Sequence, residues 1–179
     1  MVPSRKRVDK AVDLIEKLVA IDKRYTLKIV GKMPEEYAWL NDREEEKEYF
    51  DGVYRRIEAN PILKQHIQFL GFVDDIHNFF SSVGHVISMS DFESFHLTLA
   101  DGPINGAAAH TLPWSGSDSI YTDLWIREDV DEMAEQIHSL NLSNKTAYHA
   151  YLQSKHLIWQ MQPERIALGI ISAMAGEES

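Results

Sequence analysis

The stretch MSDFESFHLTLADGPINGAAAHTLPW, residues 89–114, places a carboxylate on each side of a short apolar segment. Glu93 and Asp101 lie eight positions apart, and Gly-Pro follows the second acid. An acidic protein contains many such pairs by chance, so the spacing alone does not assign a function. The structural context of the two acids decides how they are interpreted.

That context is a strand, a loop and a helix in succession. The preceding GHVISMS (84–90) is β-branched and apolar, which predicts a strand that ends near Ser90. Ser94 is placed to cap a helix over residues 95–102, which Pro103 then terminates. Glu93 is therefore expected in the loop ahead of the helix, and Asp101 about two turns into it.

Strands alternate with helices in both directions from this stretch. Apolar residues at helical spacing predict helices, and β-branched apolar runs bounded by turn residues predict strands. The predicted helices cover 9–20, 33–60, 74–83, 129–140 and 145–174, and the predicted strands cover 25–32, 66–73, 84–90, 107–114 and a very short 123–126.

This order predicts one α/β domain with a Rossmann-like parallel sheet that helices cover on both faces. Ligands of such sheets bind outside the carboxyl ends of the strands, where Glu93 is expected. The pattern begins with a helix at residue 9, without the strand that normally precedes such a helix. Either a strand is missing, or the domain belongs to a longer protein.

Composition narrows the classes of function. The 179 residues carry a formal charge of −10, which argues against general binding of nucleic acid or membrane surfaces. The chain has no cysteine, so disulfides and thiolate metal sites are excluded. No signal peptide and no run of about 20 apolar residues is found, which favours a cytoplasmic protein.

The start of the predicted helix forms an anion site. The backbone N–H groups of Phe95, His96 and Leu97 would point into the crevice at the strand ends, and the helix dipole strengthens their attraction for phosphate. A carboxylate beside such a site is better suited to sugar hydroxyls, which donate hydrogen bonds. Residues 89–114 thus predict a site for a phosphorylated sugar compound.

The arrangement resembles the carboxy-terminal, nucleotide-sugar-binding domain of retaining GT-B glycosyltransferases of the E-x7-E type (glycosyl transferases group 1). Their signature EGFGLVLLEAMACG is similar to ESFHLTLADGPING, with Glu93 and Asp101 on the two acids and Gly106 on the later glycine, where it is expected to allow close packing behind the helix. LKIVG (27–31) and IQFLGFV (67–73) look like two of the family's strands. SRKRVDKAVDLIEKL (4–18) looks like its phosphate-binding segment and places Lys6 on the family's lysine.

The resemblance implies a role for each matched residue. Lys6 would contact the donor diphosphate, and the amides of Phe95, His96 and Leu97 would hold the same phosphates and sugar oxygens. Glu93 would be the catalytic residue, binding sugar hydroxyls and stabilising the developing charge. Asp101 would bind the ribose. The resemblance implies transfer with retention, without a covalent intermediate, and no metal or other cofactor in this domain.

The same resemblance implies partners. They are a nucleotide-diphosphate sugar, an acceptor such as a glycan or lipid-linked glycan of polysaccharide biosynthesis, and the enzyme's amino-terminal acceptor domain, which is absent from residues 1–179. Alone, this hexosyltransferase-type half is expected to be inactive or weak. An apolar stripe in the C-terminal helical segment 145–175 would support a homodimer. It consists of Tyr148, Tyr151, Leu152, Leu157, Ile158, Trp159, Ile166 and Ile170.

Four departures from the family pattern keep a second interpretation open. Asp101 is one methylene shorter than the family's glutamate, Ser94-Phe95-His96 replaces Gly-Phe-Gly, and Pro103 shortens the helix. Met1 stands where the family has an arginine. The alternative is a non-catalytic GT-B-like domain that serves assembly or protein interaction.

Overall fold

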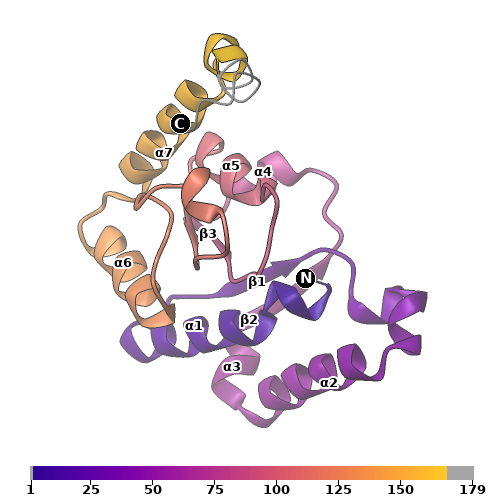
Figure 1. Ribbon diagram of the computed structural model, residues 1–179. Helices are drawn as coiled ribbons and strands as arrows, with labels where there is room; N and C mark the ends of the chain where they lie inside the picture. The colour runs from indigo at the N-terminus through magenta and orange to yellow at the C-terminus, as the bar shows by residue number, and fades with distance from the viewer. Residues whose placement is uncertain (1, 169–179) are drawn as a thin grey trace.

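The computed structural model of the protein describes residues 2–168 (Figure 1). The strands are β1 (Leu27–Val30), β2 (Ile67–Gly71), β3 (His85–Ser88) and β4 (Ala108–Thr111). The α-helices are α1 (Val8–Ile21), α2 (Glu44–Ala59), α3 (Pro61–His66), α4 (Ile76–Ser81), α5 (Leu97–Ile104), α6 (Val130–Leu142) and α7 (Thr146–Gln160). The short 3-10 helices are η1 (Ser4–Lys6), η2 (Pro34–Glu36), η3 (Ala38–Asp42) and η4 (Ser117–Ser119).

The strands are parallel, as predicted, but over residues 2–168 they form two separate pairs. β1 pairs with β2, with Leu27 opposite Ile67, and β3 pairs with β4, with His85 opposite Ala108. The predicted short strand 123–126 is wrong. It contributes a single parallel bridge from Ile126 to Thr111, because the chain turns away on either side of that contact.

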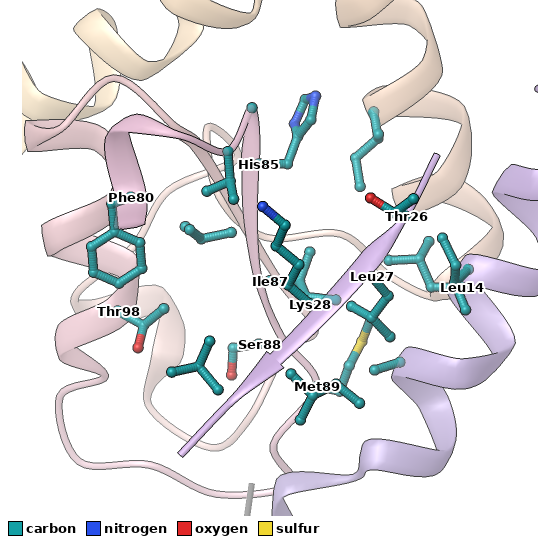
Figure 2. Close-up of a pocket in the computed structure, with 18 of the residues that line it drawn as sticks. Leu14, Thr26, Leu27, Lys28, Phe80, His85, Ile87, Ser88, Met89 and Thr98 are labelled. Atoms are coloured by element: carbon teal, nitrogen blue, oxygen red, sulfur yellow. The ribbon is translucent and has the colours of Figure 1, made fainter. Parts of the chain in front are cut away.

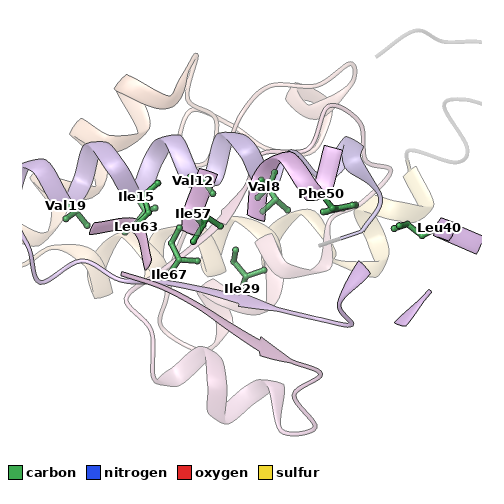
Figure 3. Packing of buried hydrophobic residues seen from close by; sticks show 11 residues of the cluster. Val8, Val12, Ile15, Val19, Ile29, Leu40, Phe50, Ile57, Leu63 and Ile67 are labelled. Atoms are coloured by element: carbon green, nitrogen blue, oxygen red, sulfur yellow. The ribbon is translucent and has the colours of Figure 1, made fainter. Parts of the chain in front are cut away.

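Helix α1 joins the two strand pairs through opposite sides of its surface. One side buries Val12 and Ile15 against α2, α3, β1 and β2 (Figure 3). The other side buries Leu14 and Leu18 against α6, including Met133, and against Met89 and Leu112, which directly follow β3 and β4. Apolar positions at helical spacing on both sides of one helix therefore hold the pairs together, although within residues 2–168 no hydrogen-bond ladder connects them.

A second core lies on the other side of β3 and β4, where α4, α5 and α7 cover the strands (Figure 1). Leu99 of α5 and Trp125 are fully buried there, and Leu157 of α7 packs against them. Helices thus cover both faces of the parallel strands, which confirms the predicted fold class.

Helix α7 and the chain after it agree with the predicted C-terminal helices. α7 buries Gln153 and Leu157, and a further helical segment begins at Pro163 and covers 163–168. Much of the predicted apolar stripe is exposed, including Tyr148, Ile158 and Trp159. The stripe residue Ile170 lies outside the described residues. Over residues 2–168, no helix is long and apolar enough to cross a membrane.

Three histidines lie next to one another: His85 of β3, which is half-buried, and His110 of β4 and His149 of α7, which are buried. His85 Nε2 lies 3.0 Å from Asn141 Oδ1, and His85 Nδ1 lies 3.0 Å from His110 Nε2. His110 also stacks on His149. If His85 donates to the Asn141 oxygen, its other nitrogen accepts from His110, so the two rings pair as neutral imidazoles, and His110 Nδ1 stays buried without a hydrogen-bond partner in the described residues.

Acidification is expected to destabilise the fold through these histidines. Burial lowers the pKa of His85, His110 and His149 below the ordinary value of 6.5, and the charge of Arg127 further lowers that of His110 and His149. Groups with a lowered pKa bind more protons when unfolded, so the stability they contribute is present above about pH 6.5 and is lost as pH falls below it.

Urea unfolding between pH 7.5 and 5.5 measures this effect. The free energy of unfolding should fall over that range, and His110→Gln should flatten the dependence. The control is His77→Gln, at an exposed position on α4, which should leave the slope unchanged. A flat profile for the unchanged protein would contradict the expectation.

Candidate functional site at the carboxyl ends of the strands

Residues at the N-terminus and in the loop after β3 meet at the carboxyl ends of the strands. The Asp91 N–H donates to Arg5 O at 2.9 Å. Lys6 Nζ forms an ion pair with Glu93 Oε1, although the two residues are 87 positions apart. Arg5 Nη1 lies 3.5 Å from the same oxygen. The structure therefore brings together two of the residues that the sequence assigned to the site, Lys6 and Glu93.

The ion pair keeps Glu93 ionised despite its burial. Its side chain is 10% exposed, and burial alone would raise the pKa of this carboxyl. The hydrogen bonds from Lys6 and Ser90 outweigh that effect and lower the pKa below the ordinary value. Glu93 is therefore an anion at neutral pH, able to accept hydrogen bonds from hydroxyl groups or to stabilise a nearby positive charge.

His96 is a neutral imidazole at the start of α5. Burial, followed by the positive charge of Lys6, lowers the pKa of His96 to about 4, although Glu93 opposes the shift. Its Nδ1 is buried without a hydrogen-bond partner in the described part of the chain. A neutral ring that carries one proton can donate to a phosphate or sugar oxygen without adding charge.

Helix α5 begins two residues later than the sequence predicted. The N-cap residue is His96, the first helical residue is Leu97, and Ser94 makes no cap. The amide of Leu97 therefore belongs to the first turn, while those of Phe95 and His96 lie in the loop ahead of it. The Leu97 side chain is exposed. Phe95 stacks on Tyr121, whose hydroxyl donates to His96 O at 3.3 Å.

Pro103 does not end α5, which was predicted to stop before it. The helix continues to Ile104, with Pro103 in its last turn. A proline there leaves the carbonyl four residues earlier, that of Leu99, without its helical partner. The buried indole of Trp125 supplies the missing donor to Leu99 O at 3.1 Å. The side chain of Trp125, which is distant in the sequence, thus offsets the cost of a proline inside the helix.

The close packing behind α5 comes from Gly102 rather than Gly106. A Cβ atom at Gly102 would overlap Val86 of β3, whereas one at Gly106 would meet nothing within 4 Å. Gly106 has a φ of 92°, so its role is the left-handed turn between α5 and β4. The expectation that Gly106 permits close packing was therefore wrong.

Asp101 lines a cavity of about 660 Å³ together with Lys6, Ser90, His96 and Thr98. Figure 2 shows part of this cavity, with Thr98 of α5 and Ser88 of β3 among the residues around it. Glu93 is joined to the same place through its ion pair with Lys6. All of the residues that the sequence selected for donor contacts thus belong to η1, the loop after β3, or α5.

The basic cluster at the start of the chain consists of Arg5, Lys6, Arg7 and Lys10. Besides Glu93, the acids Asp9 and Asp91 hold it in place, and the sequence analysis missed both. Arg7 adopts a left-handed conformation with φ 51° and lies 2.7 Å from Asp9 and 3.0 Å from Asp91. Lys10 lies 3.5 Å from the same Asp91 carboxylate. Hydrogen bonding to Asp9 is the main cause that raises the pKa of Arg7. In the sequence, only its position two residues before Glu93 could have indicated Asp91.

The described residues contain no group of three or more His, Asp or Glu side chains able to hold a metal ion. The side chains at the candidate site are one paired ammonium (Lys6), one ionised carboxylate (Glu93), one neutral imidazole (His96) and the aspartate of α5 (Asp101).

Comparison with solved structures places this arrangement in a known architecture. The chain superposes on TarM with a TM-score of 0.75 at 20% identity, covering 96% of this chain and 33% of TarM. It superposes on Anabaena HepE in complex with UDP with a TM-score of 0.72 at 18% identity, covering 97% and 46%. The chain has the fold of one half of a GT-B glycosyltransferase.

A third solved structure is similar at lower identity. WaaG, a glycosyltransferase involved in lipopolysaccharide biosynthesis, matches with a TM-score of 0.62 at 14% identity, covering 89% of this chain and 40% of WaaG. The chain thus spans between a third and a half of the length of these GT-B structures. No protein-family model and no curated protein sequence matches it.

Proposed function

We propose that the chain is the donor-binding half of a retaining, hexosyltransferase-type glycosyltransferase and binds a nucleotide-diphosphate sugar. The single observation that supports this most is the meeting of Lys6, Glu93 and His96 at the carboxyl ends of the strands, next to the start of α5. In a GT-B half this is where a ligand with phosphate and hydroxyl groups would find complementary partners.

Each side chain has a distinct role in the proposed complex. Lys6 leaves Glu93 and pairs with the diphosphate, and the Leu97 amide at the start of α5 binds the same phosphates. Glu93, released from Lys6, accepts hydrogen bonds from the sugar hydroxyls and stabilises the oxocarbenium-like transition state. His96 donates from its neutral ring to a phosphate or sugar oxygen. Asp101 binds the ribose hydroxyls.

The rest of the proposed enzyme lies outside residues 1–179. The transfer needs an acceptor domain that brings a glycan or lipid-linked glycan to the sugar, because positioning supplies much of the rate in such reactions. The isolated chain therefore binds donor and transfers weakly or not at all. The solved HepE structure contains UDP, which makes UDP-sugars the first donors to test.

Calorimetric titration with UDP-glucose, UDP, UMP and the GDP equivalents tests the proposal. One diphosphate nucleotide should bind at least tenfold more tightly than its monophosphate. Lys6→Met should weaken binding of the diphosphate at least tenfold, about 1.4 kcal/mol. Glu93→Gln should weaken the sugar nucleotide more than the free diphosphate, because its contacts are with the sugar.

Lys64→Met is the matched control, since Lys64 forms an ion pair with Glu58 on α3 and α2, away from the site. It should leave all affinities unchanged. Equal affinity in the Lys6 and Lys64 variants, or no saturable binding by a folded sample across the whole panel, would count against donor binding.

The second candidate is a non-catalytic GT-B-like domain that serves assembly. The observation that favours it is the exposed stripe on α7, with Tyr148, Tyr151 and Ile158 more than half exposed. A surface of this kind fits a protein partner or a second copy of the chain. The chain also superposes on the solved GtfA/B complex, at 18% identity. Absence of donor binding together with a stable dimer in solution would favour this function.

A further inference from the structure

Helix α2 contacts the segment around Lys6 through residues of one face. Glu46, Tyr49 and Phe50 are spaced three and four positions apart, so they lie on the same side of the helix. Phe50 is buried in the same core as Val8, the first residue of α1 (Figure 3). The same face of α2 therefore reaches the start of α1 and the 3-10 helix η1 immediately before it.

Glu46 binds the first residue of η1 with both of its carboxylate oxygens. Its Oε2 accepts from the Ser4 N–H at 2.8 Å, and its Oε1 accepts from the Ser4 hydroxyl at 2.6 Å. Glu46 is partly buried, whereas Glu44 and Glu45, which share the first turn of α2, are exposed. Within residues 2–168, Glu46 is the one acid of this turn that bonds to η1.

Tyr49 binds on the other side of Lys6, at the start of α1. Its hydroxyl donates to Asp9 Oδ1 at 2.6 Å and accepts from the Asp9 N–H at 3.1 Å. Between the two anchor points, Arg7 adopts a left-handed conformation that residues with a side chain rarely take. The path of the chain from Ser4 to Asp9 is thus fixed at both ends from α2.

The 3-10 helix η1 needs such contacts because it is a single turn. Two backbone hydrogen bonds close it, and a turn this short does not hold its shape by itself. The Lys6 ammonium also pairs with Glu93, but a diphosphate that takes this ammonium removes that support. The contact with Glu46 and the hydrogen bond from the Asp91 N–H to Arg5 O then keep η1 in place.

We infer that Glu46 is a positioning residue that acts through Lys6. By accepting both hydrogen bonds from Ser4, it holds η1 where the Lys6 ammonium can reach the diphosphate of the donor. The inference rests on the proposed function, which gives Lys6 its ligand, and it adds a residue of α2 to the site. Such preorganisation strengthens binding, because the cation need not be ordered when the ligand arrives.

The first measurement is hydrogen exchange of the Lys6 ammonium, observed by NMR in isotope-labelled protein without any ligand. The Lys6→Met variant assigns the signal. Glu46→Ala should speed this exchange by on the order of tenfold, because an unanchored η1 leaves the ammonium free of Glu93 more often. Glu46→Gln should leave it unchanged, since a side-chain amide can accept from the Ser4 N–H and donate to the Ser4 hydroxyl.

The matched control is Glu45→Ala, which removes a carboxylate from the same turn of α2 without touching Ser4. Both acids favour the start of the helix through its dipole, so the two alanine variants lose that effect alike. Glu45→Ala should leave the exchange unchanged. Ser4→Ala removes one of the two hydrogen bonds to Glu46, so it should give a smaller effect of the same kind, and it replaces Glu46→Ala if that variant does not fold.

The second measurement is calorimetric titration with UDP, or with GDP if the unchanged chain prefers it. Glu46→Ala should weaken binding about fivefold in the unchanged chain and have no further effect in the Lys6→Met chain, because Glu46 acts through that ammonium. Glu46→Gln should keep the affinity. An equal loss in both backgrounds would show a general effect on the fold and overturn the inference.

The two measurements separate this inference from the proposed function. If the unchanged chain binds neither nucleotide, the proposed function fails, and exchange of the Lys6 ammonium still decides whether Glu46 positions it. Unchanged exchange in Glu46→Ala, or the same acceleration in Glu45→Ala, would overturn the inference whatever the nucleotides do.

Discussion

Replacing Gly102 by alanine is expected to lower the free energy of unfolding by about 2 kcal/mol. A Cβ atom at this position would overlap Val86 Cγ2 and lie 3.2 Å from Val86 Cγ1. Gly102 is buried in α5 and Val86 in β3, so neither backbone has room to retreat. Helix α5 would have to move away from the strand, and with it the His96 and Asp101 side chains of the candidate site.

Chemical denaturation of two matched variants checks this expectation. Gly52→Ala, in α2 with nothing within 4 Å of the new Cβ, should raise stability by about 0.5–1 kcal/mol because alanine favours a helix. Combining Gly102→Ala with Val86→Ala should recover more than 1 kcal/mol relative to the sum of the two single changes. A Gly102 variant as stable as the Gly52 variant would show that α5 does not depend on this contact.

Replacing Gln153 by methionine is expected to cost about 2–4 kcal/mol. The buried side chain of Gln153 accepts from Ala109 N at 2.8 Å and donates to Ala109 O at 2.6 Å and to Leu124 O at 2.7 Å. The side-chain amide thus takes the place of a neighbouring strand's peptide group along β4. Two residues further along β4 the partner is a main-chain group, because Thr111 N donates to Trp125 O.

Methionine has a similar shape but would leave the buried N–H and C=O groups of Ala109 without partners, whereas Leu124 O keeps the hydrogen bond that it accepts from His149 Nε2. Thermal and urea unfolding measure the loss. The control is Gln65→Met on the exposed surface of α3, which should change stability by less than about 0.5 kcal/mol. Hydrogen exchange should also rise at Ala109 in the Gln153 variant alone. Equal stability of the two variants would contradict the role given to Gln153.

Local patterns predicted the elements well because their causes are local. The four strand cores lie within the runs that β-branched and apolar residues marked, and Asp75 caps α4 through Asn78 N near the start of the predicted helix 74–83. The start of α5 was misplaced because Ser94 has the chemistry of a cap, whereas the loop conformation that decides the cap depends on Tyr121 and Phe95.

The parts that escaped prediction depend on residues far apart in the sequence. Nothing near Gly102 indicates that Val86 lies against it, and nothing near Pro103 indicates that Trp125 satisfies Leu99. The resemblance selected Lys6 and Glu93 separately, while their ion pair is a property of the folded chain. The division of the strands into two pairs is also a long-range property, because the alternation of helices and strands does not tell which strand edges pair.

The ion pairs around η1 have a consequence for how the site responds to salt. Arg5 and Lys6 face Glu93, Arg7 and Lys10 face Asp91, and Arg7 also pairs with Asp9, so three carboxylates offset most of the charge of the four cations that make the N-terminus look basic. A diphosphate approaching the site meets little net attraction at long range and gains its contacts by exchanging partners at short range. Ionic strength screens distant charges more than adjacent ones, so a site with little long-range attraction should show an association rate that changes little with salt.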